Sequence, residues 1–91
     1  MKVENIKNSN GNKVKNQFII FDSEYTAFQS YDSVIVKTVF VDGKRQVLLD
    51  ANTWDYSKTT SKYRNQFLGE SKKETEKKIK SGEYKLVDLN S

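Results

Sequence analysis

The sequence has 91 residues, with 16 Lys or Arg against 12 Asp or Glu, so its formal net charge is +4. It contains neither Cys nor His, which excludes disulfides, the common zinc ligand sets and any catalysis that needs a thiolate or an imidazole base. The length predicts one domain over residues 1–91, and a hydrophobic fraction of 35% is sufficient for one modest core. The longest apolar run spans only residues 18–21 and the N-terminus carries no apolar export signal, so we expect a cytoplasmic protein without a membrane partner.

Strands are predicted first along the chain. Residues 1–7 form a short strand and residues 8–13 a turn, in which Asn10-Gly11 is typical of type I′ geometry. Together, residues 1–13 are expected to be a loosely ordered N-terminal strand and turn. The β-branched and aromatic content of residues 14–21 and 25–30 predicts two further strands.

The strongest local signal is a hairpin made by residues 33–41 and 44–50 around Asp42-Gly43, a type I′ turn sequence. Pairing Val41 with Lys44 predicts the register and therefore the two faces. The more apolar face, which we assign to the core, consists of Val34, Val36, Thr38, Phe40, Arg45, Val47 and Leu49. The opposite face consists of Ile35, Lys37, Val39, Val41, Gln46, Leu48 and Asp50.

Two helices and a last strand are predicted in the C-terminal part. A helix over residues 60–68 ends at Gly69, and Tyr63 and Phe67 form its apolar stripe. Ser71 and Glu74 make a capping box that opens a helix over residues 72–81, and residues 84–89 return to a strand. The fold class is therefore α+β: a small antiparallel sheet of four to five strands, two short C-terminal-half helices and a final strand.

No pattern in the sequence predicts an enzyme. The four glycines match neither a P-loop nor a dinucleotide fingerprint, and the acidic residues are scattered. We therefore expect a protein without catalytic residues, cofactor or metal.

A cluster of aromatic and basic residues is the candidate partner-binding surface: Trp54, Tyr56, Lys58, Lys62 and Arg64, extended by Lys72 and Lys73 on the second helix. Lys and Arg side chains neutralise phosphates and aromatic rings stack on bases, which is how single-stranded nucleic acid is bound. The excess positive charge also lies here, since residues 57–91 carry nine basic and five acidic residues. A core role for Trp54 and Tyr56, and a merely solvated Lys-rich helix, remain open alternatives.

The segment from Asn52 to Gly69, with its core Trp-Asp-Tyr-Ser-Lys-Thr-Thr-Ser-Lys-Tyr, resembles a stretch found in an uncharacterised family of small bacteriophage and mobile-element proteins. The similarity extends from Asn16 towards Asn90. It implies a phage-type accessory protein in the cytoplasm of a bacterial host, and it implies no catalytic or ligand residue.

Two functions follow as hypotheses. The first is a nucleic-acid-binding module that uses the cluster. The alternative is a protein-binding inhibitor of a host defence protein, as anti-CRISPR proteins are, or of a replication protein. A homodimer through an exposed hairpin edge is a further possibility that the sequence leaves open.

Overall fold

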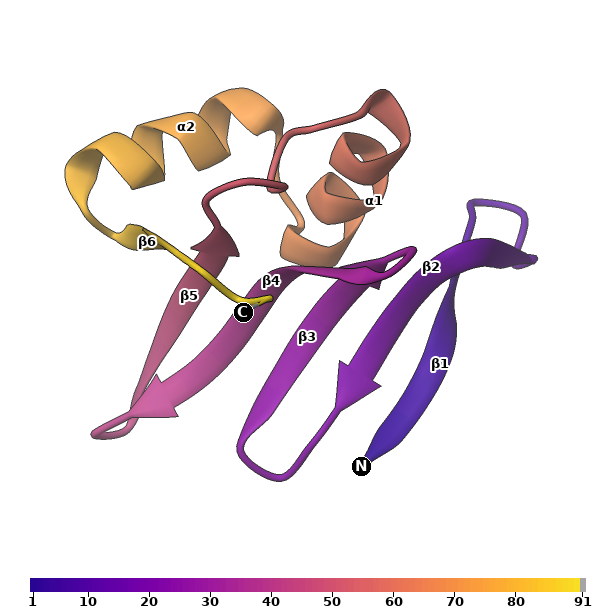
Figure 1. The fold of residues 1–91 in the computed structure, drawn as a ribbon, viewed down its shortest axis with the longest axis horizontal. Helices are drawn as coiled ribbons and strands as arrows, with labels where there is room; N and C mark the ends of the chain where they lie inside the picture. Colours follow the sequence, from indigo (N-terminus) through magenta and orange to yellow (C-terminus); the bar gives the residue numbers. More distant parts are fainter. Residues whose placement is uncertain (91) are drawn as a thin grey trace.

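Six strands pair in chain order into one sheet, β1-β2-β3-β4-β5-β6, with two helices gathered over one end of it (Figure 1). The computed structural model describes residues 1–90. The elements are β1 (Lys2–Lys7), β2 (Lys13–Phe21), β3 (Tyr25–Ser30), β4 (Ser33–Val41), β5 (Lys44–Asp50), α1 (Lys58–Leu68), α2 (Lys72–Ser81) and β6 (Tyr84–Val87). The α+β class is confirmed, but the predicted four to five strands were too few.

The segments predicted as strands at residues 1–7 and 84–89 form the two edges of the sheet. β1 pairs antiparallel with β2 and buries Ile6, although it offers few apolar residues of its own. β6 pairs with β5 in the parallel direction, which is possible because α1 and α2 form the crossover between them. The sheet is therefore mixed rather than purely antiparallel.

The hairpin predictions had different outcomes at their two turns. Asp42 and Gly43 both have positive φ, 53° and 78°, and Val41 pairs with Lys44, so the type I′ turn and its register are confirmed. The type I′ prediction for Asn10-Gly11 is wrong, since only Gly11 has positive φ. Here the Asn8 carbonyl accepts a hydrogen bond from the Gly11 amide at 3.0 Å, and the Asn8 side chain accepts from two further amides of the longer loop.

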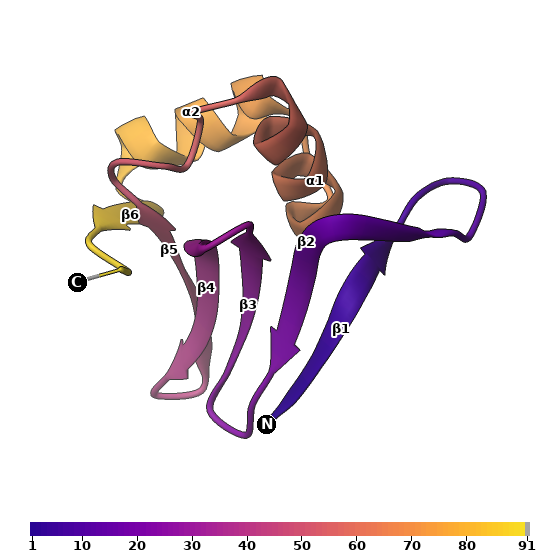
Figure 2. The ribbon, with the colours of Figure 1, turned by 45° about the vertical axis from the view of Figure 1, so that its right-hand side comes forward.

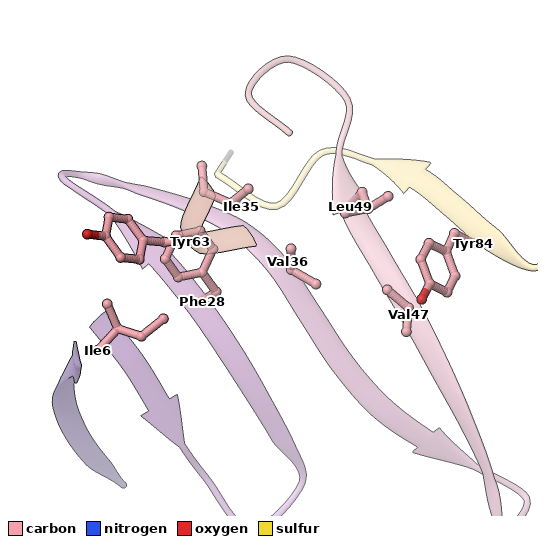
Figure 3. Packing of buried hydrophobic residues seen from close by; sticks show 8 residues of the cluster. All are labelled: Ile6, Phe28, Ile35, Val36, Val47, Leu49, Tyr63 and Tyr84. Atoms are coloured by element: carbon pink, nitrogen blue, oxygen red, sulfur yellow. The ribbon is translucent and has the colours of Figure 1, made fainter. Parts of the chain in front are cut away.

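The core lies between the sheet and the helices. Figure 3 shows its buried cluster, which comprises Ile6, Phe28, Ile35, Val36, Val47, Leu49, Tyr63 and Tyr84. Phe28 of β3 stacks on Phe67 of α1 with ring centroids 6.0 Å apart, which confirms the predicted helix stripe as a packing surface.

Residues at both ends of the hairpin depart from the predicted core face and its opposite: Val34 pairs with Gln29 beyond the bulge, Arg45 is exposed, and Ile35 and Phe40 exchange environments. Ile35 was assigned to the outer face but is fully buried, because the register between β3 and β4 shifts there and the bulge turns Ile35 to the same side as Val36. Phe40 was assigned to the core but is 70% exposed. It lies near the hairpin tip, and the helices cover the opposite end of the strands (Figure 2).

Local side-chain caps set the helix boundaries. Ser57 is the N-cap of α1 and accepts a hydrogen bond from the Thr60 amide at 3.1 Å, so the helix begins two residues before the predicted start. The capping box of Ser71 and Glu74 at α2 is confirmed. Within residues 1–90, no helix is long and apolar enough to cross a membrane.

Candidate nucleic-acid interface

An open hollow of about 610 Å³ lies where the loop after β5 meets both helices. It is lined by Asp55, Tyr56, Ser57, Lys58, Ser61, Lys62, Asn65 and Lys72. Four of the seven predicted partner-binding residues are thus brought together in one place: Tyr56, Lys58, Lys62 and Lys72. The remaining three, Trp54, Arg64 and Lys73, do not line it.

Asp50 fixes the start of the loop that carries this site. Its carboxylate accepts hydrogen bonds from the Thr53 hydroxyl at 2.6 Å and from the Leu89 amide at 2.9 Å, while its carbonyl accepts from the Trp54 amide at 3.0 Å. Burial by itself would raise the pKa of Asp50, but these hydrogen bonds outweigh it and hold the pKa below its usual value. The loop therefore leaves the sheet in one defined direction.

Arg64 is buried beneath the hollow and does not face solvent. Its guanidinium donates to the Trp54 carbonyl at 2.6 Å and to the Asn65 side chain at 2.8 Å, and it lies 5.2 Å from the centroid of the Trp54 ring. Its exposed fraction is 0%, so the prediction that Arg64 contacts a partner needs correction. Its two terminal nitrogens, Nη1 and Nη2, instead donate hydrogen bonds that hold the loop against α1.

Trp54 shares this structural role. It is half-buried and packs against the core cluster, with its carbonyl bonded to Arg64. The Trp54 ring therefore packs inward. This favours the alternative of a core role for Trp54 over that of a free stacking surface. Tyr56, by contrast, is 50% exposed and lines the hollow.

Asp55 is the hub that joins the loop to both helices. Its carboxylate accepts from the Ser61 hydroxyl at 2.6 Å, pairs with Lys72 at 2.6 Å and lies 3.3 Å from the Arg64 guanidinium. Burial would raise the pKa of Asp55, but the hydrogen bonds from Lys72 and Ser61 lower it further than burial raises it. Asp55 therefore stays ionised and neutralises much of the positive charge of Lys72.

Lys58 and Lys62 are the cations of the hollow that remain uncompensated. They lie four residues apart in α1, on neighbouring turns of one helix face, and both are exposed. Within residues 1–90 neither lies within ion-pair distance of a carboxylate, and the Lys62 ammonium lies 5.3 Å from the centroid of the Tyr63 ring. Lys73 is exposed at the start of α2, outside the hollow.

The polar residues Ser57, Ser61 and Asn65 also line the site, and the sequence reasoning did not single them out. The signal was present in their spacing, since they recur every four residues and therefore share one helix face. Ser57 accepts from the Thr60 amide, which leaves its hydroxyl hydrogen available to a ligand.

Glu70 anchors α2 on the sheet through hydrogen bonds. Its carboxylate accepts hydrogen bonds from Tyr84 at 2.7 Å, from Lys78 at 2.8 Å and from Thr75 at 2.6 Å. Both oxygens of this carboxylate accept hydrogen bonds from the chain itself. This arrangement fixes the position of α2, the helix that carries Lys72.

Among residues 1–90 no group of three or more Asp or Glu side chains is placed to hold a metal ion. The fold and the hollow define a small α+β protein with a basic, hydroxyl-rich surface site. The chain belongs to DUF8033, a family of unknown function, whose family model matches residues 1–83. Comparisons with curated proteins and with solved structures found no match.

Proposed function

We propose that this protein binds single-stranded nucleic acid in the hollow between the loop and the two helices, as an accessory protein of a phage or mobile element in the bacterial cytoplasm. The observation that carries the proposal is the pair of uncompensated cations, Lys58 and Lys62, beside the half-exposed ring of Tyr56 in a preformed hollow. Positive charges without an internal partner are available to phosphates, and their use releases counterions from the nucleic acid.

The ring of Tyr56 favours a single strand over a duplex. A base can stack on a protein ring only when its own face is free, which is the case in an unpaired strand. Stacking tolerates every base, so binding without sequence preference is expected. The hydroxyl of Ser57 and the side-chain amide of Asn65 add hydrogen-bonding groups at the wall of the site.

The groups that hold the hollow in shape support the same function indirectly. Arg64 and Asp55 hold the loop and the two helices in one geometry before any ligand arrives. A site that is already ordered loses less conformational entropy on binding, so two cations and one ring are sufficient for measurable affinity.

The test is fluorescence anisotropy with a labelled oligothymidylate of about 12 nucleotides, at several salt concentrations. The double variant Lys58→Ala/Lys62→Ala should weaken binding about tenfold and reduce the slope of log affinity against log salt by about 1.4, which is about 0.7 for each lost phosphate contact. Tyr56→Leu should weaken binding about fivefold or more with the salt slope unchanged, because it removes stacking alone.

The matched control is Lys77→Ala/Lys80→Ala, which removes the same charge from exposed positions of α2 outside the hollow. If this control weakens binding as much as the double variant in α1 does, the affinity reflects net charge and no site exists in the hollow. Wild-type protein that does not bind the oligonucleotide even at low salt would also contradict the proposal.

A further inference from the structure

The face of the sheet that turns away from the helices carries a row of large apolar side chains without a covering layer. We call it the outer face. The strand register places its residues: Ile20 pairs with Ala27, Ala27 with Lys37, and Lys37 with Leu48. Its half-buried apolar residues are Phe18, Ile20, Tyr25, Val39 and Leu48, and Val3 and Val41 extend it at exposed fractions of 55% and 50%.

Neither helix packs on this face. The helix residues that pack in or against the core cluster are Tyr63, Phe67, Leu68 and Ile79, and that cluster lies on the opposite side of the sheet (Figures 2 and 3). Antiparallel sheets commonly leave one face in water, but such a face usually carries polar residues, whereas this one carries a row of apolar side chains. The outer face is thus the place where another element can add a layer.

The charges on the outer face are nearly all positive. Lys37, Lys44 and Lys85 belong to it by register, and none of them makes an ion pair within residues 1–90. The Lys37 ammonium lies 4.3 Å from the centroid of the Tyr25 ring. Asp50, the acidic strand residue of this face, is already bonded to Thr53 and Leu89.

A hollow of about 400 Å³ interrupts this surface, and Glu24, Tyr25, Lys37 and Val39 are among the residues that line it. A hollow of this size accepts one or two large apolar side chains, and the ammonium of Lys37 lies at its wall. The hollow therefore offers apolar side chains together with one cation, Lys37, and one carboxylate, Glu24.

These features discriminate among three kinds of molecule as the occupant of the outer face: a second copy of the chain, a nucleic acid and a helix of another protein. A second copy of the chain would bring lysines against lysines, and like charges that meet across an interface oppose association. Nucleic acid would find phosphate partners but mostly aliphatic side chains in place of stacking rings. A helix with an apolar stripe and flanking carboxylates matches both properties of the face.

We propose that the outer face docks an acidic amphipathic helix of a partner protein. The six strands give a face about 24 Å wide at about 4.8 Å between strands, and a helix is about 10 Å wide, so one helix fits over the middle strands, with Lys37 beneath it and Lys44 and Lys85 on the side of β5 and β6. The interaction is separate from the nucleic-acid hollow and does not depend on it.

The experiment uses two synthetic peptides of about 18 residues that share a Leu stripe at helical spacing and differ only in carrying Glu or Lys on their flanks. Binding to the full chain is followed by anisotropy of the labelled peptides, and the contact is mapped by NMR amide shifts. The Glu peptide should bind at least tenfold more tightly than the Lys peptide, with shifts centred on β3, β4 and β5.

Charge reversal at the centre of the face supplies the decisive comparison. Lys37→Glu should reduce affinity for the Glu peptide at least fivefold and increase affinity for the Lys peptide, while circular dichroism shows the fold retained. The control Lys62→Glu makes the same charge change in the other hollow and should leave the peptide preference unchanged. Leu48→Ser should weaken binding of either peptide, because it removes apolar area.

Three results would overturn the proposal. The first is equal affinity for the two peptides, or no binding of either. The second is an equal response to Lys37→Glu and Lys62→Glu, which would mean that only net charge matters. The third is a stable dimer in sedimentation equilibrium that Leu48→Ser dissociates, which would identify a second copy of this chain as the occupant.

Discussion

Arg64 is the largest side chain that the fold buries completely, and its position explains why the binding motif is also a structural motif. A buried guanidinium is costly unless most of its donors are satisfied. Here the Trp54 carbonyl, the Asp55 carboxylate and the Asn65 side chain accept from it, while its Nε has no partner within residues 1–90. A basic residue beside an aromatic one in the sequence therefore marks an internal clamp in this chain.

Substitution at Arg64 should consequently affect stability before it affects binding. Arg64→Ala leaves the Trp54 carbonyl without a partner and removes one of the partners of the Asp55 carboxylate, and we expect a loss of about 3 kcal/mol in the free energy of unfolding. Urea denaturation measures it. Lys62→Ala, at an exposed position of the same helix, should change stability by less than about 0.5 kcal/mol. A similar small effect at Arg64 would show that the clamp is dispensable.

Glu70 makes stability dependent on pH. Burial would raise the pKa of this carboxyl, but hydrogen bonds from Lys78 and Thr75 lower it further, so the folded pKa lies below the usual value of about 4.3. The unfolded chain then binds this proton more tightly than the folded one does. The stabilising contribution is present above about pH 5 and is lost as the pH falls through the folded pKa.

Between about pH 5 and pH 3, the free energy of unfolding should therefore decrease, and Glu70→Gln should make that decrease shallower. Part of the decrease should persist in the variant because Asp50 and Asp55 also have lowered pKa values. Urea midpoints across this range provide the measurement. Glu83→Gln, at an exposed position, is the control and should leave the profile as in wild type. An unchanged profile in Glu70→Gln would refute the assignment.

At the scale of elements, local chemistry in the sequence predicts turns and caps better than it predicts faces. The Asp42-Gly43 turn and the Ser71 capping box follow from short-range backbone geometry, which a few residues determine. Ile35 and Phe40 were misassigned because alternation assumes a regular ladder with a covered face. The bulge and the position of the helices are long-range features that no local pattern encodes.

The candidate site was predicted in part for the same reason. The density of aromatic and basic residues in one segment predicted that Tyr56, Lys58 and Lys62 lie together, since neighbours in a loop and a short helix stay neighbours in space. Burial of Arg64 could not be read from that segment, because the partners that surround it depend on how the loop folds back. The contribution of Lys72 depends on α2 packing beside the loop.

The Asp42-Gly43 turn gives a prediction for β4 and β5. Gly43 has φ of 78°, a left-handed conformation that a side chain makes unfavourable, and a Cβ there would meet nothing within 4 Å. Gly43→Ala should therefore destabilise by about 1 kcal/mol through backbone strain alone. Thermal unfolding measures it, with Asp42→Asn as a control that keeps a residue tolerant of positive φ. Unaltered stability in Gly43→Ala would mean that the turn rearranges at no cost.

The segment after β6 crosses the edge of the sheet and connects it to β4 like a clip. The Asn90 side chain accepts from the Val34 amide at 2.7 Å and donates to the Val34 carbonyl at 3.0 Å. Asn90→Ala removes both hydrogen bonds at an exposed place, so a loss of about 1 kcal/mol is expected in urea denaturation. Asn52→Ala, in the exposed loop, is the comparison and should lose less. Equal losses would indicate that the clip contributes nothing specific.

For the molecule as a whole, stability should be graded across the sheet. β3 and β4 are paired on both sides and supply Phe28 and Val36 to the core, while β1 and the four-residue β6 are edges. Native-state hydrogen exchange should therefore find the slowest amides in β3 and β4, with the amides of β6 exchanging at least tenfold faster. Uniform protection across all six strands would instead indicate that the sheet opens only by global unfolding.

The order of the strands also has a consequence for synthesis on the ribosome. Because each strand from β2 to β5 pairs with the strand made just before it, the sheet can assemble progressively as the chain leaves the exit tunnel. The two helices and β6 are synthesised last. The side chains that pack beneath them therefore stay exposed to water until nearly the whole chain has been made. The nascent chain thus exposes two apolar faces of the sheet, and its own C-terminal third covers only one of them.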